Sequence, residues 1–425
     1  MAVKDVILTI AIMLGAGLVS QFVADSLRAP RMLVLLGAGS LLGPSVAGAI
    51  DVPLSSTGAQ LLLTLGVSFV LFHGGLQLST RILGRVAVGL GLLVVPGVIL
   101  TAVVTGLVAA AVFGLPLSTG LLIGAVLAPT DPAILIPLFE RIRLRPKISQ
   151  TVIAESALND PTGAVLALAF AGVVLSGSTS MTKPLTDFVV DLAISTGIGI
   201  VFGVVLSAAV SSRRAGIWGE SAAIAVMAVI CGGYFSIDSA GGSGYLGAFL
   251  AGLIVGNMTE VGLAMHSHHE RDMRVLISTV ADVMVILVFI TLGANLPWGD
   301  ISGNLVPALA VVATLVFVAR PLAVLVCLLP DRRSRWTREE IVFLAWTRET
   351  GVVPAALAGI VVGLRVPHAE LVVTTVALAI VVTLALQSTT KRWLARRLGL
   401  LEPIAVVPDD GEIVPDPVPM IGAAP

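Results

Sequence analysis

The sequence predicts an all-α membrane protein with thirteen transmembrane helices. Of its 425 residues, 56% are hydrophobic and only 12% are charged, whereas soluble domains carry about 25% charged residues. The apolar runs are about 20 residues long, the length that a helix needs to cross a bilayer, and they lack the alternation of barrel strands. A third observation is that Lys and Arg are concentrated in alternate loops.

Runs of apolar residues define the spans in order along the chain. The first run follows Lys4 and has no clear small-residue cleavage site after it, so we interpret it as an uncleaved first helix. The thirteen predicted spans cover residues 5–24, 32–50, 57–79, 86–112, 117–139, 149–175, 185–210, 217–236, 243–258, 274–296, 303–329, 339–364 and 370–390.

The distribution of positive charge supports this count. With the N-terminus placed outside, 20 of the 25 Lys and Arg residues lie in the inner loops and the tail, and three lie in outer segments. Cytoplasmic loops carry the excess of positive charge, so the C-terminus is predicted to be cytoplasmic. Residues 1–390 would form the transmembrane unit and 391–425 a cytoplasmic tail, which is rich in Pro and acidic residues from Glu402 onward and is predicted to be disordered.

The composition also excludes several classes of function. The sequence offers no soluble domain large enough for a nucleotide site, so an ion gradient is the expected energy source. A net charge of −1 argues against a nucleic-acid partner. Cys231 and Cys327 lie in apolar spans without metal-ligand spacing, and we interpret both as small buried hydrophobic residues. No nucleophile–base set or metal motif predicts an enzyme.

The thirteen spans can be divided into two inverted six-helix repeats with one helix between them. Helix 5 (117–139) would then correspond to helix 12 (339–364), and helix 6 (149–175) to helix 13. Helices 5 and 12 both carry polar and Pro residues near the middle of the span. Matching interrupted segments in two halves are the best sequence indication of a transporter site.

Helix 5 contains the run Ala128-Pro129-Thr130-Asp131-Pro132. Two prolines three residues apart remove two amide donors and clash with preceding carbonyls, so the helix must open or kink there. Freed carbonyls can coordinate a cation, and Asp131 would compensate the partial positive charge of a half-helix N-terminus. The simpler alternative is a proline kink with a capping Asp.

Helix 6 carries Glu155, Ser156, Asn159 and Asp160 within an apolar span. Residues four apart share a helix face, so Ser156 lies with Asp160 and Glu155 with Asn159. A charged carboxylate at the bilayer centre costs roughly 2.5–3.5 kcal/mol on insertion scales. Two carboxylates are therefore an expensive way to join helices, and an ion or proton path is favoured over a structural network.

Helix 12 contributes Arg348, a buried cation that requires a carboxylate. Glu155 is the candidate partner and the adjacent Glu349 is the rival. Asp131 and Arg348 lie roughly 14–17 Å from the cytoplasmic ends of their spans, near the middle of the bilayer, and Asp160 lies at a similar depth. Arg320 in helix 11 lies at about the same depth, and we expect it to form a structural ion pair.

Other polar residues in or near the spans carry weaker signals. His73 could sense pH, but a lone buried His is more often structural. Asp282 in helix 10 is interpreted in the same way. The cytoplasmic trio His266, His268 and His269 is expected to be solvated rather than to bind a metal.

The intramembrane residues resemble those of the monovalent cation–proton antiporters of the NhaP type, which are relatives of the animal sodium/proton exchangers. The resemblance covers nearly the whole chain and is most specific in helices 5 and 6. The matching residues are Thr130-Asp131-Pro132, the Glu-Ser-x-x-Asn-Asp run from Glu155 to Asp160, Arg348, and the stretch from Tyr245 to Asn257, which is similar to helix 9 of that family.

The resemblance implies a core domain of helices 4–6 and 11–13, in which the broken helices 5 and 12 cross. A dimerisation domain of helices 1–3 and 7–10 would lie beside it. The resemblance further implies a homodimer in a prokaryotic cell membrane, working by alternating access. A monovalent cation and a proton would be the transported ions, and no further cofactor is implied.

The resemblance also assigns roles to individual residues. Asp160 would carry the cation or the proton, and Glu155 would pair with Arg348. Asn159 stands where electrogenic relatives carry a second Asp, which implies electroneutral one-to-one exchange. The expected cation ligands are Asp160, Asp131, Thr130, Ser156, Asn159 and Glu155, and the supporting residues are Arg348, Glu349, His73 and Arg320.

Two departures from the family pattern matter, and one further residue bears on the transported ion. His73 occupies a place where an acid is common, and Glu349 follows Arg348 where Gly is more usual. Pro161 after the Asn-Asp pair occurs in some potassium/proton members. Na⁺ is the expected cation. Potassium/proton antiport is the alternative, because oxygen ligands serve Na⁺, K⁺ and Li⁺ alike.

The physical argument agrees with exchange. Burial of a carboxylate favours its protonated form, whereas a bound cation favours its ionised form, so proton and cation compete for one site. An ion channel would need a continuous pore without such competition. A proton-coupled symporter of an organic anion would need an exposed cation, for which Arg348 is the only good candidate. A purely structural scaffold would tolerate Asp160→Asn.

Overall fold

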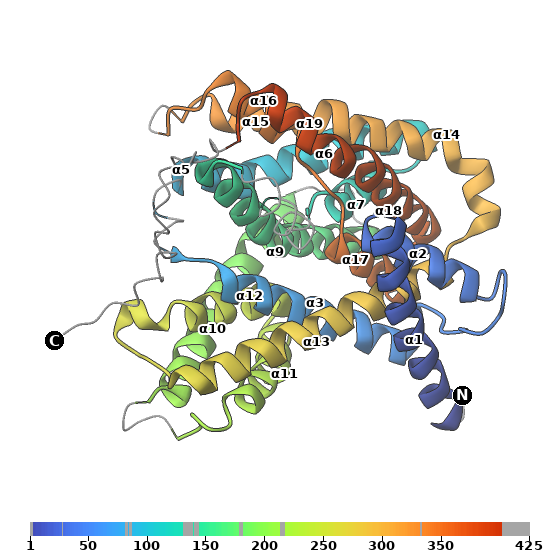
Figure 1. The fold of residues 1–425 in the computed structure, drawn as a ribbon. Coiled ribbons are helices and arrows are strands. Elements are labelled where there is room, and N and C mark those ends of the chain that lie inside the picture. Colours follow the sequence, from blue (N-terminus) through green and yellow to red (C-terminus); the bar gives the residue numbers. More distant parts are fainter. Residues whose placement is uncertain are drawn as a thin grey trace, which may run out of the picture.

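The computed structural model describes residues 3–27, 29–80, 84, 87–130, 139, 144–177, 182–212, 217–331 and 334–401. Within these ranges the chain is nearly all helical (Figure 1). The elements are α1 (Val3–Leu27), α2 (Arg31–Leu42), α3 (Thr57–Gln77), α5 (Ala87–Leu92), η1 (Leu93–Gly97), α6 (Val98–Phe113), α7 (Leu117–Leu127), α9 (Pro146–Ser176), α10 (Thr182–Val210), α11 (Ala222–Ser239), α12 (Gly244–Gly256), η2 (Met258–Val261), α13 (Ser267–Ala294), α14 (Trp298–Thr314), η3 (Leu315–Ala319), α15 (Arg320–Leu328), α16 (Arg338–Trp346), α17 (Val352–Gly363), α18 (Ala369–Thr383), η4 (Leu384–Ser388) and α19 (Thr389–Arg397).

The helices agree with the predicted all-α membrane class. In the described ranges, nine helical segments are long and apolar enough to cross a membrane. Four shorter apolar helices, α2, α7, α12 and α17, account for the other predicted spans. Helices α7 and α17 are short because each adjoins a non-helical stretch of helix 5 or helix 12. The all-α class is confirmed, and the number of membrane crossings stays a prediction.

Helical structure extends beyond the last predicted span. The predicted tail begins at residue 391, but helical structure continues through η4 and α19 to Arg397. One side of α19 is buried through Lys391 and Ala395, while Trp393 and the arginines of the helix are exposed. The charged residues therefore ended the apolar pattern before the helix ended. Residues 402–425 lie outside the described residues.

Two wide helical turns occur in spans that the predicted repeats would pair. The π-helix η1 interrupts helix 4 and contains Pro96, and η3 interrupts helix 11 just before Arg320 and Pro321. A third π-helix, η4, lies in helix 13. Such turns are rare and frequently lie at functional sites. Helices 4 and 11 correspond in the predicted inverted repeat, and the presence of a π-helix in both agrees with it.

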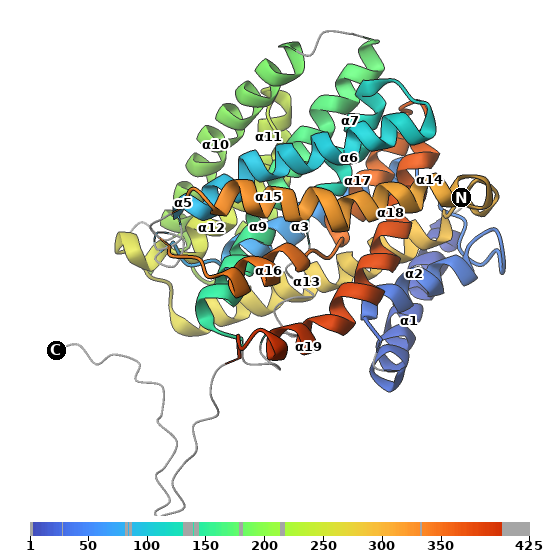
Figure 2. The same ribbon diagram turned by 90° about the horizontal axis from the view of Figure 1, so that it is seen from above.

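The helices form two groups in Figure 1. Helices α5–α9 and α14–α19 gather in the upper half of the view, and α1–α3 and α10–α13 in the lower half. The two groups contain the helices that the sequence assigns to a core domain and to a dimerisation domain, and that division stays a prediction. Figure 2 shows the same helices from above, with α19 at the lower edge of the view.

Close packing of α6 on α7 positions the end of α7. At Gly124 of α7, a Cβ atom would clash with the carbonyl of Ala102 in α6 and would lie 2.7 Å from the amide nitrogen of Gly106. Only glycine allows the two backbones to approach this closely. This close contact fixes α7 against α6 one turn before Leu127, where α7 ends and the break in helix 5 begins.

Candidate functional site

The break in helix 5 is present where the two prolines predict it. Helix α7 ends at Leu127, and the residues from Ala128 to Thr130 are not helical. Helix α9 lies against the break, because a Cβ atom at Gly163 would be 2.7 Å from Cδ of Pro129. Asp131, a predicted cation ligand, lies outside the described residues, as does Pro132.

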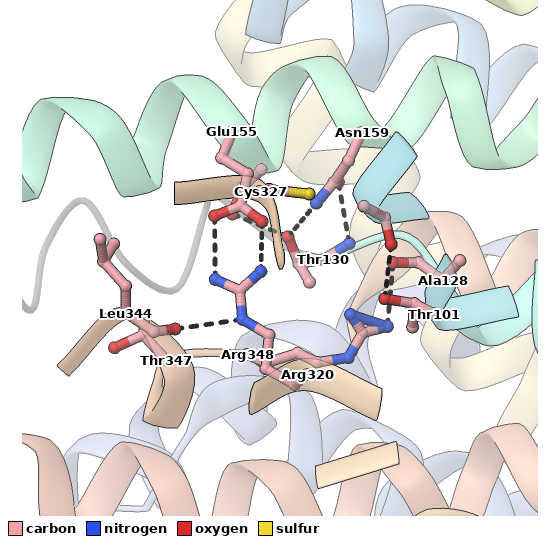
Figure 3. A network of polar contacts seen from close by, with 12 residues as sticks. Thr101, Ala128, Thr130, Glu155, Asn159, Arg320, Cys327, Leu344, Thr347 and Arg348 are labelled. Atoms are coloured by element: carbon pink, nitrogen blue, oxygen red, sulfur yellow. Dashed lines mark hydrogen bonds and ion pairs between the residues drawn. The ribbon is translucent and has the colours of Figure 1, made fainter. Parts of the chain in front are cut away.

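Thr130 joins the break to helix α9 through three buried hydrogen bonds. The backbone N–H of Thr130 donates to Oδ1 of Asn159 at 3.1 Å, and Nδ2 of Asn159 donates to Oγ1 of Thr130 at 2.8 Å. The Thr130 hydroxyl in turn donates to Oγ of Ser156 at 2.8 Å. Asn159 therefore replaces a backbone hydrogen bond that the broken helix lacks (Figure 3). Three of the predicted ligand residues are thus brought together.

Asp160 is buried next to this cluster. It lies in the middle of α9 with 2% of its surface exposed, one turn beyond Ser156 and adjacent to Asn159. Ser156 itself is 2% exposed. The structure therefore places a carboxyl group, two hydroxyl groups and an amide within one stretch of α9 and the break beside it. Such oxygens suit a hard monovalent cation.

Glu155 forms an ion pair with Arg320 rather than with Arg348. Nη2 of Arg320 donates to Oε2 of Glu155 at 2.9 Å, and Nη1 contacts Oε1. Nε of Arg320 donates to the carbonyl of Leu344 at the end of α16, at 3.1 Å. The predicted pair of Glu155 with Arg348 is wrong, and the expected ion pair of Arg320 is confirmed. The two arginines lie at similar depth, so depth could not distinguish them.

Arg348 binds backbone carbonyls. Its Nη2 donates to the carbonyl of Ala128 at 2.9 Å and also contacts that of Leu127. These carbonyls end α7 and have no partner within that helix. A cation there also compensates the negative end of the helix dipole. Arg348 therefore caps the half-helix of helix 5 (Figure 3).

Glu349, the rival partner of Arg348, pairs with Lys391 instead. Both side chains are fully buried, and Nζ of Lys391 contacts Oε1 of Glu349. One residue further, the N–H of Thr350 donates to Oγ1 of Thr383 in α18 at 3.1 Å. These contacts join the helix 12 break to helix 13. Sequence reasoning missed this pair because Lys391 was assigned to the tail.

A small cavity lies between the two arginines and the break. Its wall includes part of helix 4, where η1 and the start of α6 face the site. Its polar and charged lining residues are Thr101, Glu155, Asn159, Arg320 and Arg348. The Glu155–Arg320 pair and the Asn159–Thr130 contacts therefore adjoin the same space.

The histidines lie in other parts of the fold. His73 is in α3, where a ring nitrogen lies 2.8 Å from Nε2 of Gln77, one turn further along the helix. The rings of His268 and His269 pack with centroids 3.8 Å apart, and that of His266 lies 5.8 Å from His269. Within the described residues, these contacts do not join the histidines to the break in helix 5.

Comparison with known proteins matches most of the chain to one family. A family model described as "Sodium/hydrogen exchanger, transmembrane" matches residues 8–397. The K(+)/H(+) antiporter NhaP of Alkalimonas amylolytica is 28% identical over 414 residues, which are 96% of this chain and 69% of that protein. The Na(+)/H(+) antiporter 1 of Methanocaldococcus jannaschii is 29% identical over 377 residues, 84% of this chain and 83% of that protein.

Further similar proteins differ in length or are known as structures. The K(+)/H(+) antiporter NhaP2 of Shewanella oneidensis is 30% identical over 392 residues, but the match covers only 63% of its length and 88% of this chain. The structure of the sodium proton antiporter MjNhaP1 from M. jannaschii at pH 8 superposes with a TM-score of 0.78 at 23% identity. That match covers 93% of this chain and 99% of the other, and it shows a shared fold.

Proposed function

The chain belongs to the sodium/hydrogen exchanger family, and we propose that it is a secondary active antiporter that exchanges a monovalent cation for a proton. The single observation that carries the proposal is the junction of the helix 5 break with α9. There Thr130, Ser156 and Asn159 are hydrogen-bonded together beside the buried Asp160.

In this proposal Asp160 is the ligand that the proton and the cation share. A carboxylate removed from water is stabilised either by a proton or by a bound cation, so the two compete. The hydroxyl oxygens of Thr130 and Ser156 are available neighbours for a cation. If the loaded site crosses the membrane and the empty, charged site does not, exchange is obligatory.

The other charged residues have supporting roles in the proposal. Both carboxylate oxygens of Glu155 contact the guanidinium group of Arg320, so Glu155 balances the positive charge of Arg320. Asn159 uses both ends of its amide to hold Thr130 and thereby shapes the break. Arg348 caps α7. Asp131 is proposed as a further cation ligand from the sequence motif.

The proposal extends to the assembly and its orientation. We propose a homodimer formed through helices 1–3 and 7–10, with the N-terminus outside and the C-terminus in the cytoplasm. The support is the family resemblance together with the alternation of positive charge along the loops. The transported cation and the proton suffice for the mechanism, and no other cofactor is needed.

Coupled flux in proteoliposomes tests this function. With an acidic interior and a quenched pH-sensitive dye, we expect Na⁺ added outside to restore the fluorescence by driving proton exit. Choline at the same concentration should not, because it cannot replace a proton at a small oxygen-lined site. Half-maximal concentrations for Na⁺, Li⁺ and K⁺ identify the cation, with K⁺ as the alternative to Na⁺. Proton flux that does not require any of these cations would instead indicate a channel.

We expect the exchange to be electroneutral, with one cation against one proton. The amide of Asn159 cannot bind and release a proton, so Asp160 alone changes occupancy between the loaded states. In a sodium assay, a membrane potential imposed with valinomycin and a potassium gradient should leave the direction of exchange unchanged. Reversal or strong acceleration by the potential would show that more than one proton moves per cycle, with Asp131 as the second carrier.

A further inference from the structure

An apolar groove of about 480 Å³ opens on the surface of helices α15, α16 and α19, away from the cation site. Its walls include Phe317, Leu325, Val342 and Trp393, which are 57%, 41%, 49% and 58% exposed. In a membrane protein the nearest apolar ligand is the hydrocarbon chain of a lipid.

At one end of the groove, contacts of Trp346 join its walls. The ring of Trp346 lies 6.1 Å from that of Phe317, and its Nε1 donates to Oγ1 of Thr390 at 2.9 Å. From Phe317 the groove follows η3 and α15 to Leu325, eight residues and ~12 Å along the helix axis. Half of the hydrocarbon core is ~15 Å thick, so the groove matches most of one leaflet.

Two arginines lie near lining residues toward the other end of the groove, where Glu339 is also exposed. The contact of Trp346 with Thr390 joins the end of α16 to the start of α19, so the two helices run in opposite directions along the groove. Arg338, at the start of α16, shares a helix face with the lining residue Val342. Arg397, near the end of α19, lies with its guanidinium carbon 5.2 Å from the ring centroid of Trp393. Both arginines are exposed.

An apolar groove of leaflet length with two arginines at its outer end matches one class of ligand. Arginine binds phosphate oxygens with a planar set of donors, and Trp prefers the membrane interface. Basic pockets between helices on the cytoplasmic side bind anionic headgroups. We propose that this groove binds one anionic phospholipid, with an acyl chain between Phe317 and Trp393 and the phosphate at Arg338 and Arg397.

Lipid in this groove would act on the helix 12 break. Trp346 is the last residue of α16, and the non-helical stretch that follows contains Arg348, the cap of α7. A chain packed against Trp346 would hold α16 against α15 and α19. The bound lipid should therefore stabilise the protein. Lipid binding and stability are measured without transport, so this inference can be tested whether or not the proposed antiport is correct.

Tryptophan quenching in the full-length protein in detergent tests the site directly. One variant keeps Trp346 and Trp393, with the other three tryptophans changed to Phe. The matched control keeps Trp218 and Trp298, which are 48% and 50% exposed and lie outside the groove. We expect dibrominated phosphatidylglycerol to quench the groove pair at a concentration at least about fivefold lower than dibrominated phosphatidylcholine. The control pair should not distinguish the two lipids.

Two further variants separate the headgroup from the acyl chain. In the groove-tryptophan background, Arg338→Gln with Arg397→Gln should remove the preference for phosphatidylglycerol, whereas Arg271→Gln, at an exposed arginine of α13, should retain it. Ala345→Phe should place a ring in the path of the acyl chain and weaken quenching by both lipids, while the thermal stability without added lipid stays near that of the parent.

Three results would overturn the proposal. The first is equal quenching of the groove pair by the two lipids, which would indicate ordinary membrane contact. The second is a preference for phosphatidylglycerol that survives loss of both arginines. The third is an equal preference in the control pair. Each result leaves the cation-flux test of the antiport function unaffected.

Discussion

Replacing Asp160 with Asn should reduce cation/proton exchange to the level of protein-free vesicles while the protein still folds. Asn has nearly the shape of Asp but cannot ionise, so the site can neither release a proton nor offer a negative charge to a cation. Asp160 is buried in the middle of α9 beside Ser156 and Asn159, where the neutral amide avoids the cost of a buried charge. The measurement is dye dequenching with Na⁺, Li⁺ and K⁺ in turn.

The matched control is Asp282→Asn, the same chemical change in α13. Asp282 is exposed, so this variant should retain exchange. Both variants should reach the membrane in normal amounts and elute as a single peak in size-exclusion chromatography. Substantial coupled exchange by Asp160→Asn at normal protein level would contradict the assignment of Asp160 as the carrier.

Breaking the ion pair of Glu155 with Arg320 should produce a large loss of thermal stability. Both side chains are nearly completely buried, at 3% and 4% exposure. Glu155→Gln leaves the Arg320 charge without its carboxylate, and removing one partner of a buried pair costs about 3–5 kcal/mol. We expect a clear decrease in the apparent melting temperature, followed by fluorescence-detected size-exclusion chromatography after heating.

Double variants distinguish the two arginines. Arg320→Gln added to Glu155→Gln removes the uncompensated charge and should recover part of the lost stability. Arg348→Gln added to Glu155→Gln should not, because Arg348 binds the carbonyl of Ala128, and its loss should add to the first. Recovery with Arg348→Gln but not with Arg320→Gln would contradict the observed pairing.

Several features could be predicted because they depend on local sequence. The all-α membrane class follows from the length and hydropathy of the apolar runs. The break after Leu127 follows from Pro129 and Pro132, because proline removes a donor wherever it lies in a helix. That Ser156, Asn159 and Asp160 lie near one another on α9 follows from helical periodicity. The roles proposed for these residues in transport stay predictions.

The pairing of charges could not be predicted. Depth in the membrane follows from the sequence, but the direction of a side chain around its helix depends on rotation and on irregular turns. Arg320 follows the π-helix η3, whose wider turn changes the phase of the residues after it. Sequence spacing placed Arg320 and Arg348 at one level and gave no reason to choose Arg320 as the partner of Glu155.

The sequence by itself therefore determined the class of protein, the position of the helix 5 break and the polar face of helix 6, because each depends on residues close together in the chain. Only the tertiary structure decided that Glu155 binds Arg320, that Arg348 caps α7, and that Glu349 binds Lys391. These pairs join residues 42–220 positions apart. Their partners are set by how helices pack and rotate against one another, a property of the whole fold.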